Sequence, residues 1–378
     1  MKTTMGVTRL NEDESKYIQV KNNLKKWIVS KNIKQGEKVP SENQLVDLFH
    51  VSRHTIRQAI GELVNEGWLL REQGRGTFVN LPFQSSGGDN VPSRTKIAVI
   101  TTYLADYIFP HIISGIESVV SENGHTLSLL STGNAFSTER RSLETVILEG
   151  VDGLIIEPTK STLPNLNIDL YFILQERNIP FVMLHSSYVE LNASIVALDD
   201  SKGAYLATKH LIDMGHEKIS GIFKSDDMQG RNRFKGFVKA HQDAHLSVES
   251  KNVATYDTEN RIQVVENFVA KVFHDRGADR PTAVVCYNDE VAIMVINILR
   301  TLGLDVPNDV SVTGFDDSVL AQAGSVALTT VNHPKSVMGE KAVNQLYALM
   351  NDKQGMWIPR EYVFEPDLIV RGSTASPH

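Results

Sequence analysis

The spacing of hydrophobic residues along the chain changes near residue 95. Between residues 16 and 79, hydrophobic positions recur every three or four residues, which is the period of amphipathic helices. From residue 96 onward, short hydrophobic runs such as KIAVITTY, DGLIIEP and TAVVCYN alternate with longer amphipathic stretches. Alternation of this kind over about 280 residues is typical of parallel sheets flanked by helices, and the length favours two lobes over one sheet. We therefore predict an α/β protein with a small helical domain at its N-terminus.

The segment between the two patterns has the composition of a flexible linker. It reads NLPFQSSGGDNVPSR from residue 80 to residue 94 and is rich in Pro, Gly, Ser and Asn. The predicted domains are residues 1–79, with a core at 16–79, and residues 96–378. Residues 80–95 are the predicted linker.

The middle of the first domain has the features of two short helices joined by a tight turn. Ser41 followed by Gln44 is a capping-box pattern, and Leu45, Leu48 and Phe49 form a hydrophobic stripe after it. The three residues HVS that follow leave room only for a tight turn. Two helices separated by a turn of about three residues are typical of a helix-turn-helix.

The helix after this turn is expected to have one hydrophobic and one basic face. Ser52 is a candidate N-cap for it. The hydrophobic face, at i, i+3, i+4 and i+7 spacing, consists of Ile56, Ala59, Ile60 and Leu63. His54 and Arg57 lie on the opposite face, with Arg53 at the boundary. This basic face has two interpretations: a recognition surface, or the ordinary polar surface of a small helical domain.

A predicted β-hairpin follows the second helix. The stretch REQGRGTFV contains two short strand-forming runs around Gly74, Arg75 and Gly76. The glycines permit a tight turn with Arg75 at its tip. A hairpin in this position is a wing, whose tip can reach the minor groove of DNA.

The first domain resembles the GntR family of winged-helix regulators over residues 16 to 79. The resemblance is carried by VPSENQL, VSRHTIRQAIGEL, EGWL and GRGTFV. It implies binding to double-stranded DNA, and Glu42 has a second interpretation as a residue that caps a helix or orients an arginine. The residues that it implies at the DNA are Lys16, Glu42, Asn43, Ser52, Arg53, His54, Thr55, Arg57, Gln73, Gly74 and Arg75.

The distribution of charge agrees with a polyanionic partner for the first domain. The chain has a net charge of −7, but residues 1–85 alone carry +4 and the remainder carries −11. A positive N-terminal part on an acidic protein favours contact with a polyanion such as DNA.

The second domain resembles the ligand-binding part of the LacI/GalR repressors over nearly all of residues 96 to 372. Segments that carry the resemblance include GVDGLIIEPT, RNRFKGF and PTAVVCYNDEVAIMVINILRTLGLDVPNDVSVTGFDDS. The resemblance implies two lobes joined by three crossovers, with a sugar bound between them and contacts between the bodies of a homodimer.

A sugar site needs bidentate polar groups for hydroxyls and an aromatic face for the C–H side of the ring. The predicted strand ends supply both, and Arg233 and Asp316 are the best-supported ligands. The predicted sugar-binding residues are Asp106, Tyr107, Phe109, Glu157, His185, Lys224, Arg233, Asn288, Asp289, Asp316 and His333.

Several residues in or near this set have a structural interpretation. The carboxylates Asp200, Asp227, Asp289 and Asp317 stand where helix caps are common. His185 and His333 have the alternative of satisfied interior histidines, and Phe109 that of a core residue. Arg140 is interpreted as a residue of a helix surface, although the family can reach the ligand from that position.

The combination of a GntR-type head with a LacI/GalR-type body resembles the L-arabinose-responsive repressors of Gram-positive bacteria. DYIFP, EPTKS, CYNDE and VNHPKSV also carry this resemblance. It implies that L-arabinose releases the protein from a pseudo-palindromic operator. The residues alone indicate a small neutral polyol, because Lys224 and Arg233 are offset by Glu157, Asp106 and Asp316. A different small sugar is therefore the alternative effector.

Other functional classes have little support in the sequence. No G-x-G-x-x-G follows a predicted strand, no P-loop motif is present, and no serine stands in G-x-S-x-G, so we expect no enzyme, catalytic residue or cofactor. The single cysteine, Cys286, excludes a cysteine-based zinc site and suits a reducing compartment. We expect a cytoplasmic bacterial protein rather than an exported binding protein, since no apolar signal core is apparent.

Overall fold

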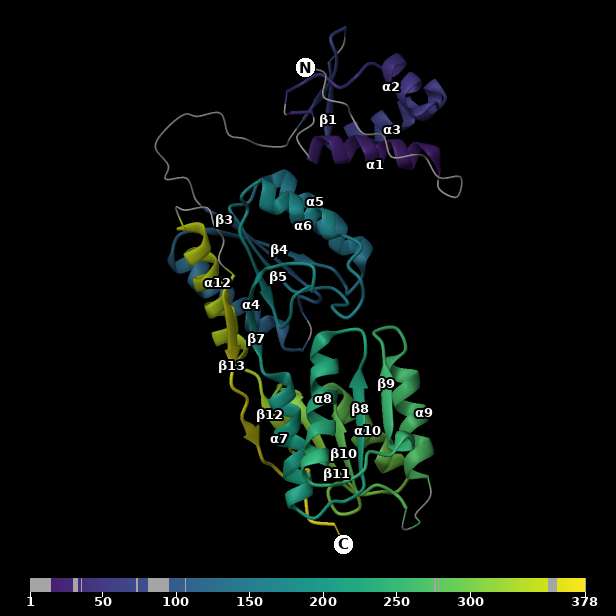
Figure 1. Cartoon of the computed structure of the whole chain (residues 1–378), viewed down its shortest axis with the longest axis vertical. Helices are drawn as coiled ribbons and strands as arrows, with labels where there is room; N and C mark the ends of the chain where they lie inside the picture. The colour runs from purple at the N-terminus through teal and green to yellow at the C-terminus, as the bar shows by residue number, and fades with distance from the viewer. Residues whose placement is uncertain are drawn as a thin grey trace. The chain divides into compact units, whose positions relative to one another are not determined.

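The computed structural model describes residues 15–29, 33–34, 36–72, 74–80, 95–105, 107–274, 277, 279–352 and 359–377. Two predicted site residues, Gln73 and Asp106, lie outside these ranges, as do residues 81–94 of the predicted linker. The N-terminal and the α/β domain are described separately below. Figure 1 shows the course of the chain.

The N-terminal domain is a three-helix unit followed by a hairpin. Its elements are α1 (Lys16–Val29), α2 (Glu42–Phe49), α3 (Arg53–Asn65), β1 (Leu69–Glu72) and β2 (Gly76–Val79). The strands β1 and β2 pair antiparallel from Leu69 opposite Val79 to Glu72 opposite Gly76. Lys38 forms an isolated antiparallel bridge to Phe78, which adds a third short stretch to this small sheet. The predicted winged helix-turn-helix is confirmed.

A continuous hydrophobic core holds the three helices together. The predicted inner face of α3 is buried, and Trp27 stacks on Phe49 with ring centroids 5.4 Å apart. The prediction is wrong at Leu48, which is 36% exposed. The reason is that Leu45 and Phe49, four residues apart, already define the inward face of the eight-residue α2.

The α/β domain has two parallel sheets, each the core of one lobe. In the first lobe all strand pairs are parallel and the order is β13-β7-β6-β5-β3-β4. Its strands are β3 (Lys96–Thr101), β4 (Thr126–Ser131), β5 (Gly153–Ile156), β6 (Phe181–Leu184), β7 (Ser194–Leu198) and β13 (Glu361–Phe364). The helices in this part of the chain are α4 (Phe109–Glu122), α5 (Phe136–Glu149), α6 (Ile168–Glu176) and α12 (Lys335–Met350).

The sheet of the second lobe has the order β14-β12-β11-β10-β8-β9. Every pair is parallel except β12 with β14. The strands are β8 (Ile219–Lys224), β9 (Val253–Tyr256), β10 (Ala283–Cys286), β11 (Ser311–Asp316), β12 (Thr329–Asn332) and β14 (Leu368–Ile369). The helices are α7 (Asp200–Asp213), α8 (Met228–Asp243), η1 (Ser250–Asn252), α9 (Arg261–Phe273), α10 (Asp289–Thr301) and α11 (Leu320–Ala323).

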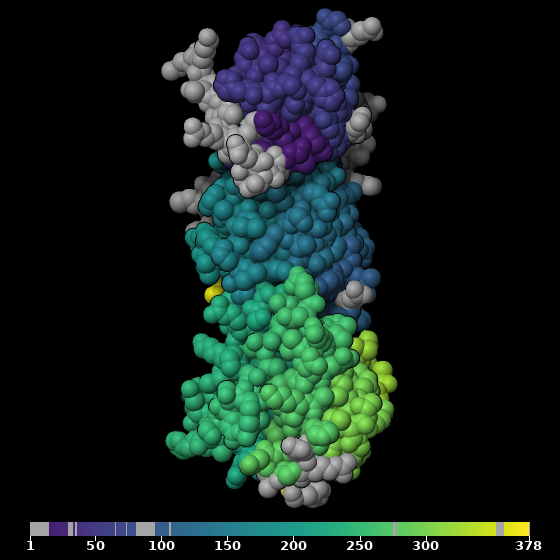
Figure 2. Space-filling model, turned by 90° about the vertical axis from the view of Figure 1, so that its right-hand side faces the viewer, coloured from purple at the N-terminus to yellow at the C-terminus, as the bar shows by residue number. Residues whose placement is uncertain are grey.

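Three crossovers join the two lobes, as predicted. The chain passes from β7 to α7, from β12 to α12, and from β13 to β14. Figure 2 shows the surfaces of the two lobes in contact, the first coloured blue to teal and the second green. The paired lobes bring the carboxyl ends of both sheets to one cavity, which is where open α/β sheets bind ligands.

Candidate functional site

The turn between α2 and α3 is fixed by local hydrogen bonds. At the start of α2, Ser41 and Gln44 form the predicted capping box. The helix ends at His50, whose φ of 52° lies in the left-handed region. Ser52 then caps α3, its hydroxyl accepting from the amide of Thr55 at 3.1 Å. These bonds set the direction of α3 and leave its first turn exposed, which is how a recognition helix is presented.

The predicted DNA-facing arginines are exposed and paired with acidic or amide side chains. Arg57 Nε donates to Glu42 Oε2 at 2.8 Å, and Arg71 forms an ion pair with the other oxygen of Glu42 at 3.6 Å. Arg53 donates to Asn43. The side chains of Arg53 and Arg57 are 56% and 61% exposed. Glu42 therefore orients arginines in this structure, which is the second of the two interpretations predicted for it.

The wing places another exposed cation beyond the end of the hairpin strands. Gly74 and Gly76 have φ values of 75° and 128°, which explains the need for glycine on both sides of Arg75. Arg75 is 75% exposed and pairs with Glu72 at 2.6 Å. The other predicted contacts within the described residues are Lys16 and His54, both exposed, and the half-buried Thr55.

The α/β domain encloses a cavity of about 570 Å³ between its lobes. Volumes of roughly 300–1,000 Å³ are typical of small-molecule sites. Nine of the predicted sugar-binding residues line it: Tyr107, Phe109, Glu157, His185, Lys224, Arg233, Asn288, Asp316 and His333.

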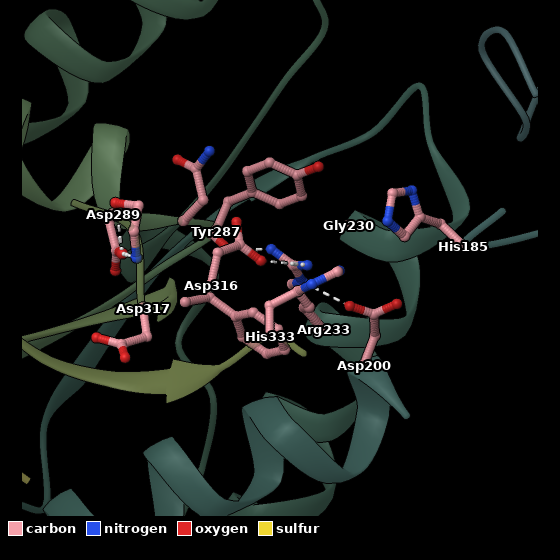
Figure 3. A network of polar contacts seen from close by, with 12 residues as sticks. His185, Asp200, Gly230, Arg233, Tyr287, Asp289, Asp316, Asp317 and His333 are labelled. Atoms are coloured by element: carbon pink, nitrogen blue, oxygen red, sulfur yellow. Dashed lines mark hydrogen bonds and ion pairs between the residues drawn. The ribbon is translucent and has the colours of Figure 1, made fainter. Parts of the chain in front are cut away.

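Arg233 is the centre of a buried ionic network in the cavity wall (Figure 3). Its guanidinium donates to Asp200 Oδ1 at 2.8 Å, to Asp316 Oδ1 at 3.2 Å and to the carbonyl of Tyr287 at 2.7 Å. It also stacks 3.6 Å from the centroid of Phe315. Burial lowers the pKa of Arg233, but the two carboxylates raise it overall, whereas burial raises the pKa of Asp200 to about 6. These partners hold the guanidinium in one orientation.

Tyr107 connects this network to the first lobe. Its hydroxyl donates to Asp316 Oδ2 at 2.8 Å and accepts from the amide of Asp289 at 3.2 Å. Tyr107 and Asp316 both have positive φ values, 61° and 96°. Left-handed backbone is rare for non-glycine residues and collects at functional sites.

Two histidines pack edge to face in the cavity wall. His185 Nδ1 lies 2.9 Å from Glu157 Oε1, and the rings of His185 and His333 are 5.2 Å apart. Burial lowers the pKa of His185, but the bond to Glu157 outweighs it and raises the pKa overall. Burial and the neighbouring His185 hold that of His333 well below its usual range. Nε2 of His185 and Nδ1 of His333 have no hydrogen-bond partner among the described residues. Both histidines belong to the lining of the cavity.

A second cation lies on the wall formed by β8. Lys224 Nζ is 3.0 Å from Asp227 Oδ2 and 3.4 Å from Asp226 Oδ1. Tyr287 also donates to Asp227, at 2.8 Å. Burial lowers the pKa of Lys224, but the two carboxylates raise it overall. The cations of the cavity are thus neutralised by protein carboxylates, as the prediction of a neutral polyol requires.

The structure does not place Asp289 among the described residues that line the cavity. Its carboxylate accepts from Thr330 at 2.6 Å and from the amide of Ser318 at 2.7 Å. It therefore ties the loop after β11 to the strand β12. The helix-cap alternative also fails for Asp289, since Asn288 caps α10. Asp317 pairs instead with Arg371 at 2.6 Å.

Sequence reasoning missed Asp200, Tyr287 and Asn134, all of which line the cavity. The position of Asp200 in the sequence indicates a possible helix cap, but the cap of α7 is its neighbour Asp199. That frees the carboxylate of Asp200 for Arg233. The sequence feature that could have identified Asp200 is the pair of consecutive aspartates after β7. Only one of the two can cap the helix, so the other carboxylate is free to bind a different partner.

Comparison with known proteins agrees with both parts of this description. Residues 16–79 match the family of bacterial regulatory proteins, gntR family, and residues 208–374 match the periplasmic binding protein-like domain. The chain is 43% identical to the "Arabinose metabolism transcriptional repressor" of Halalkalibacterium halodurans over 365 residues, which is 96% of this chain and 97% of that protein. It is also 43% identical to the protein of the same description from Geobacillus stearothermophilus, over 95% of this chain and 97% of that one. The chain belongs to this family of transcriptional repressors.

A solved structure supports the fold in the same way. The transcription regulator CcpA of Lactococcus lactis superposes with a TM-score of 0.64, covering 74% of this chain and 99% of that chain at 24% identity. As a member of the repressor family, the protein joins a DNA-binding winged helix to a LacI-type sugar-effector domain. No helix within the described residues is long and apolar enough to span a membrane.

Proposed function

We propose that this repressor controls genes of L-arabinose utilisation, and that L-arabinose is the sugar that binds its cavity and releases it from the operator. The observation that carries the proposal is the cavity itself, in which buried, ion-paired side chains lie beside aromatic residues. The two relatives of 43% identity, both described as arabinose metabolism repressors, supply the choice of sugar.

The cavity chemistry suits a neutral polyol. Arg233, Asp316 and Lys224 offer charged donors and acceptors to hydroxyls, while Phe109 and Tyr107 offer an apolar face. His185 and His333 add two nitrogens with no partner among the described residues. We propose these residues, with Glu157 and Asn288, as the sugar contacts.

The DNA-binding part is proposed to act as half of a homodimer. Two copies of α3 would read the half-sites of a pseudo-palindromic operator, with the wings at the adjacent minor grooves. Arg53, His54 and Arg57 are the proposed contacts on α3, and Arg75 is the proposed contact on the wing. The proposed domain boundaries are residues 1–79 and 96–378, with residues 80–95 as a linker that leaves half-site spacing loose, and the proposed compartment is the cytoplasm.

The function is tested by sugar titration and operator binding on the full chain. Calorimetry against a panel of pentoses and hexoses should give L-arabinose as the tightest ligand. A gel shift with operator DNA should show binding that weakens at higher salt and is relieved by the same sugar. Relief by a different sugar alone would overturn the choice of effector, and no operator binding would overturn the function.

A further inference from the structure

A group of polar contacts joins the two lobes at the edge of the cavity away from the crossovers. The crossovers leave from β7, β12 and β13, at or next to one edge of the two sheets. The contacts lie after β4, β5, β8 and β9, toward the other edge, on the right in Figure 1. We call them the rim contacts: Asn134 to Thr258, Lys160 to Glu259, Thr162 to Ser225, and Ser161 to Met228.

In the rim contact between Asn134 and Thr258, further hydrogen bonds hold both side chains in place. Asn134 is only 3% exposed and has a φ of 55°, a conformation that asparagine tolerates better than most residues. Its Oδ1 accepts from the amide of Lys160 at 3.0 Å, so its Nδ2 is aimed away from its own lobe. Nδ2 donates to Thr258 Oγ1 at 2.6 Å.

Thr258 is held in place by hydrogen bonds within the second lobe. Its hydroxyl and its amide both donate to Asp226 Oδ2, at 2.6 and 3.0 Å. A hydroxyl has one donor and can accept besides, so the single Oγ1 donates to Asp226 and accepts from Asn134. Asp226 Oδ1 lies 3.4 Å from Lys224 Nζ, and Lys224 lines the cavity. One chain of polar contacts therefore runs from the first lobe to a cation that faces the ligand.

We propose that the Asn134–Thr258 pair is the latch that holds the two lobes closed around the bound sugar, and that Asp226 couples it to Lys224. The proposal rests on the proposed function of the cavity as a sugar site. The latch forms only when the lobes meet, so it stabilises the closed state and not the open one. Because opening must break it, its loss accelerates sugar release more than it slows sugar entry.

The test compares three single variants of the full chain. Thr258→Val removes the hydroxyl and keeps the branched shape, while Thr258→Ser keeps the hydroxyl. The matched control is Thr301→Val, because the Thr301 hydroxyl is exposed and donates only to Ile298 of its own helix. Sugar affinity and dissociation rate are measured with L-arabinose. The separation of the lobes is measured between spin labels on cysteines introduced at the exposed Glu122 and Lys235.

Thr258→Val is expected to weaken sugar binding about 3- to 10-fold, chiefly through faster dissociation, because it removes the hydrogen bond from Asn134 across the lobes together with the bond to Asp226. It is also expected to increase the separation of the labels in the sugar-free and the sugar-bound protein. Thr258→Ser and Thr301→Val should stay within about twofold of the wild type. Wild-type affinity and label separation in Thr258→Val would overturn the latch. If wild-type protein does not bind L-arabinose, the proposed effector fails, and the label separation without sugar still decides whether the latch exists.

Discussion

The α3 helix and the cavity both use arginines paired with carboxylates, but in opposite ways. Arg57 is 61% exposed and makes one bond to Glu42, whereas Arg233 is 5% exposed and is held by Asp200, Asp316 and a carbonyl. An exposed ion pair contributes about 0–1 kcal/mol, so Glu42 can release Arg57 to a phosphate or a base at little cost. A buried arginine cannot leave its partners. In the proposed function, DNA recognition would therefore use exchangeable cations, and sugar recognition a cation that its partners hold in one orientation.

The largest expected effect comes from Arg233→Ala. The change leaves two carboxylates buried without their cation, which should lower the free energy of unfolding by about 3–5 kcal/mol. We expect sugar binding to be lost while the folded fraction still binds the operator, so that repression persists without induction. Chemical denaturation, calorimetry and a gel shift check the three effects. Arg231→Ala, an exposed neighbour on α8, is the control, and normal induction of Arg233→Ala would remove this residue from the site.

Arg57→Ala should have the opposite effect, with operator binding weakened and sugar binding retained. Loss of a bidentate base contact costs about 1–3 kcal/mol, so operator affinity should fall by roughly one to two orders of magnitude. Stability and sugar affinity should stay at the wild-type level, because the side chain is exposed and its ion pair is weak. Fluorescence anisotropy with labelled operator at two salt concentrations measures the effect. A variant that binds the operator like the wild type would show that Arg57 is not at the DNA.

A smaller effect is expected from Glu42→Gln, which tests the role of the exposed ion pair between Glu42 and Arg57. The glutamine keeps an acceptor for Arg57 but removes a negative charge from the face proposed to contact DNA. Affinity for unrelated DNA should rise a few-fold, while the ratio of operator to unrelated binding should fall. Competition binding measures both quantities. Lower affinity for both DNAs would indicate that Glu42 itself contacts the operator.

The sequence predicted the exposed face of α3 more completely than the lining of the cavity, for a physical reason. Residues 41–79 form the turn, α3 and the wing through local spacing and caps, so the periodicity of one segment fixes which side chains face out. The cavity is lined by residues that are spread along the chain from Tyr107 to His333. That ligands bind at the carboxyl ends of parallel strands predicts the edge of the sheet, but not the direction in which each side chain points. Asp289 turned to Ser318 and Thr330, while Asp200 turned to Arg233. Only tertiary contacts distinguish the two carboxylates.

The smallest expected effect is a pH dependence of the His185–Glu157 pair. The bond to Glu157 raises the folded pKa of His185 above its unfolded value of 6.5 despite the opposing effect of burial. The pair therefore contributes stability that is fully present below pH 6.5 and is lost as the pH rises through the folded pKa. Glu157→Gln keeps the size of the side chain and removes its charge. The difference in unfolding free energy between wild type and Glu157→Gln should shrink as the pH rises above 6.5 through the folded pKa of His185, as measured by urea denaturation. A difference that does not shrink as the pH rises would mean that His185 is neutral in the folded protein.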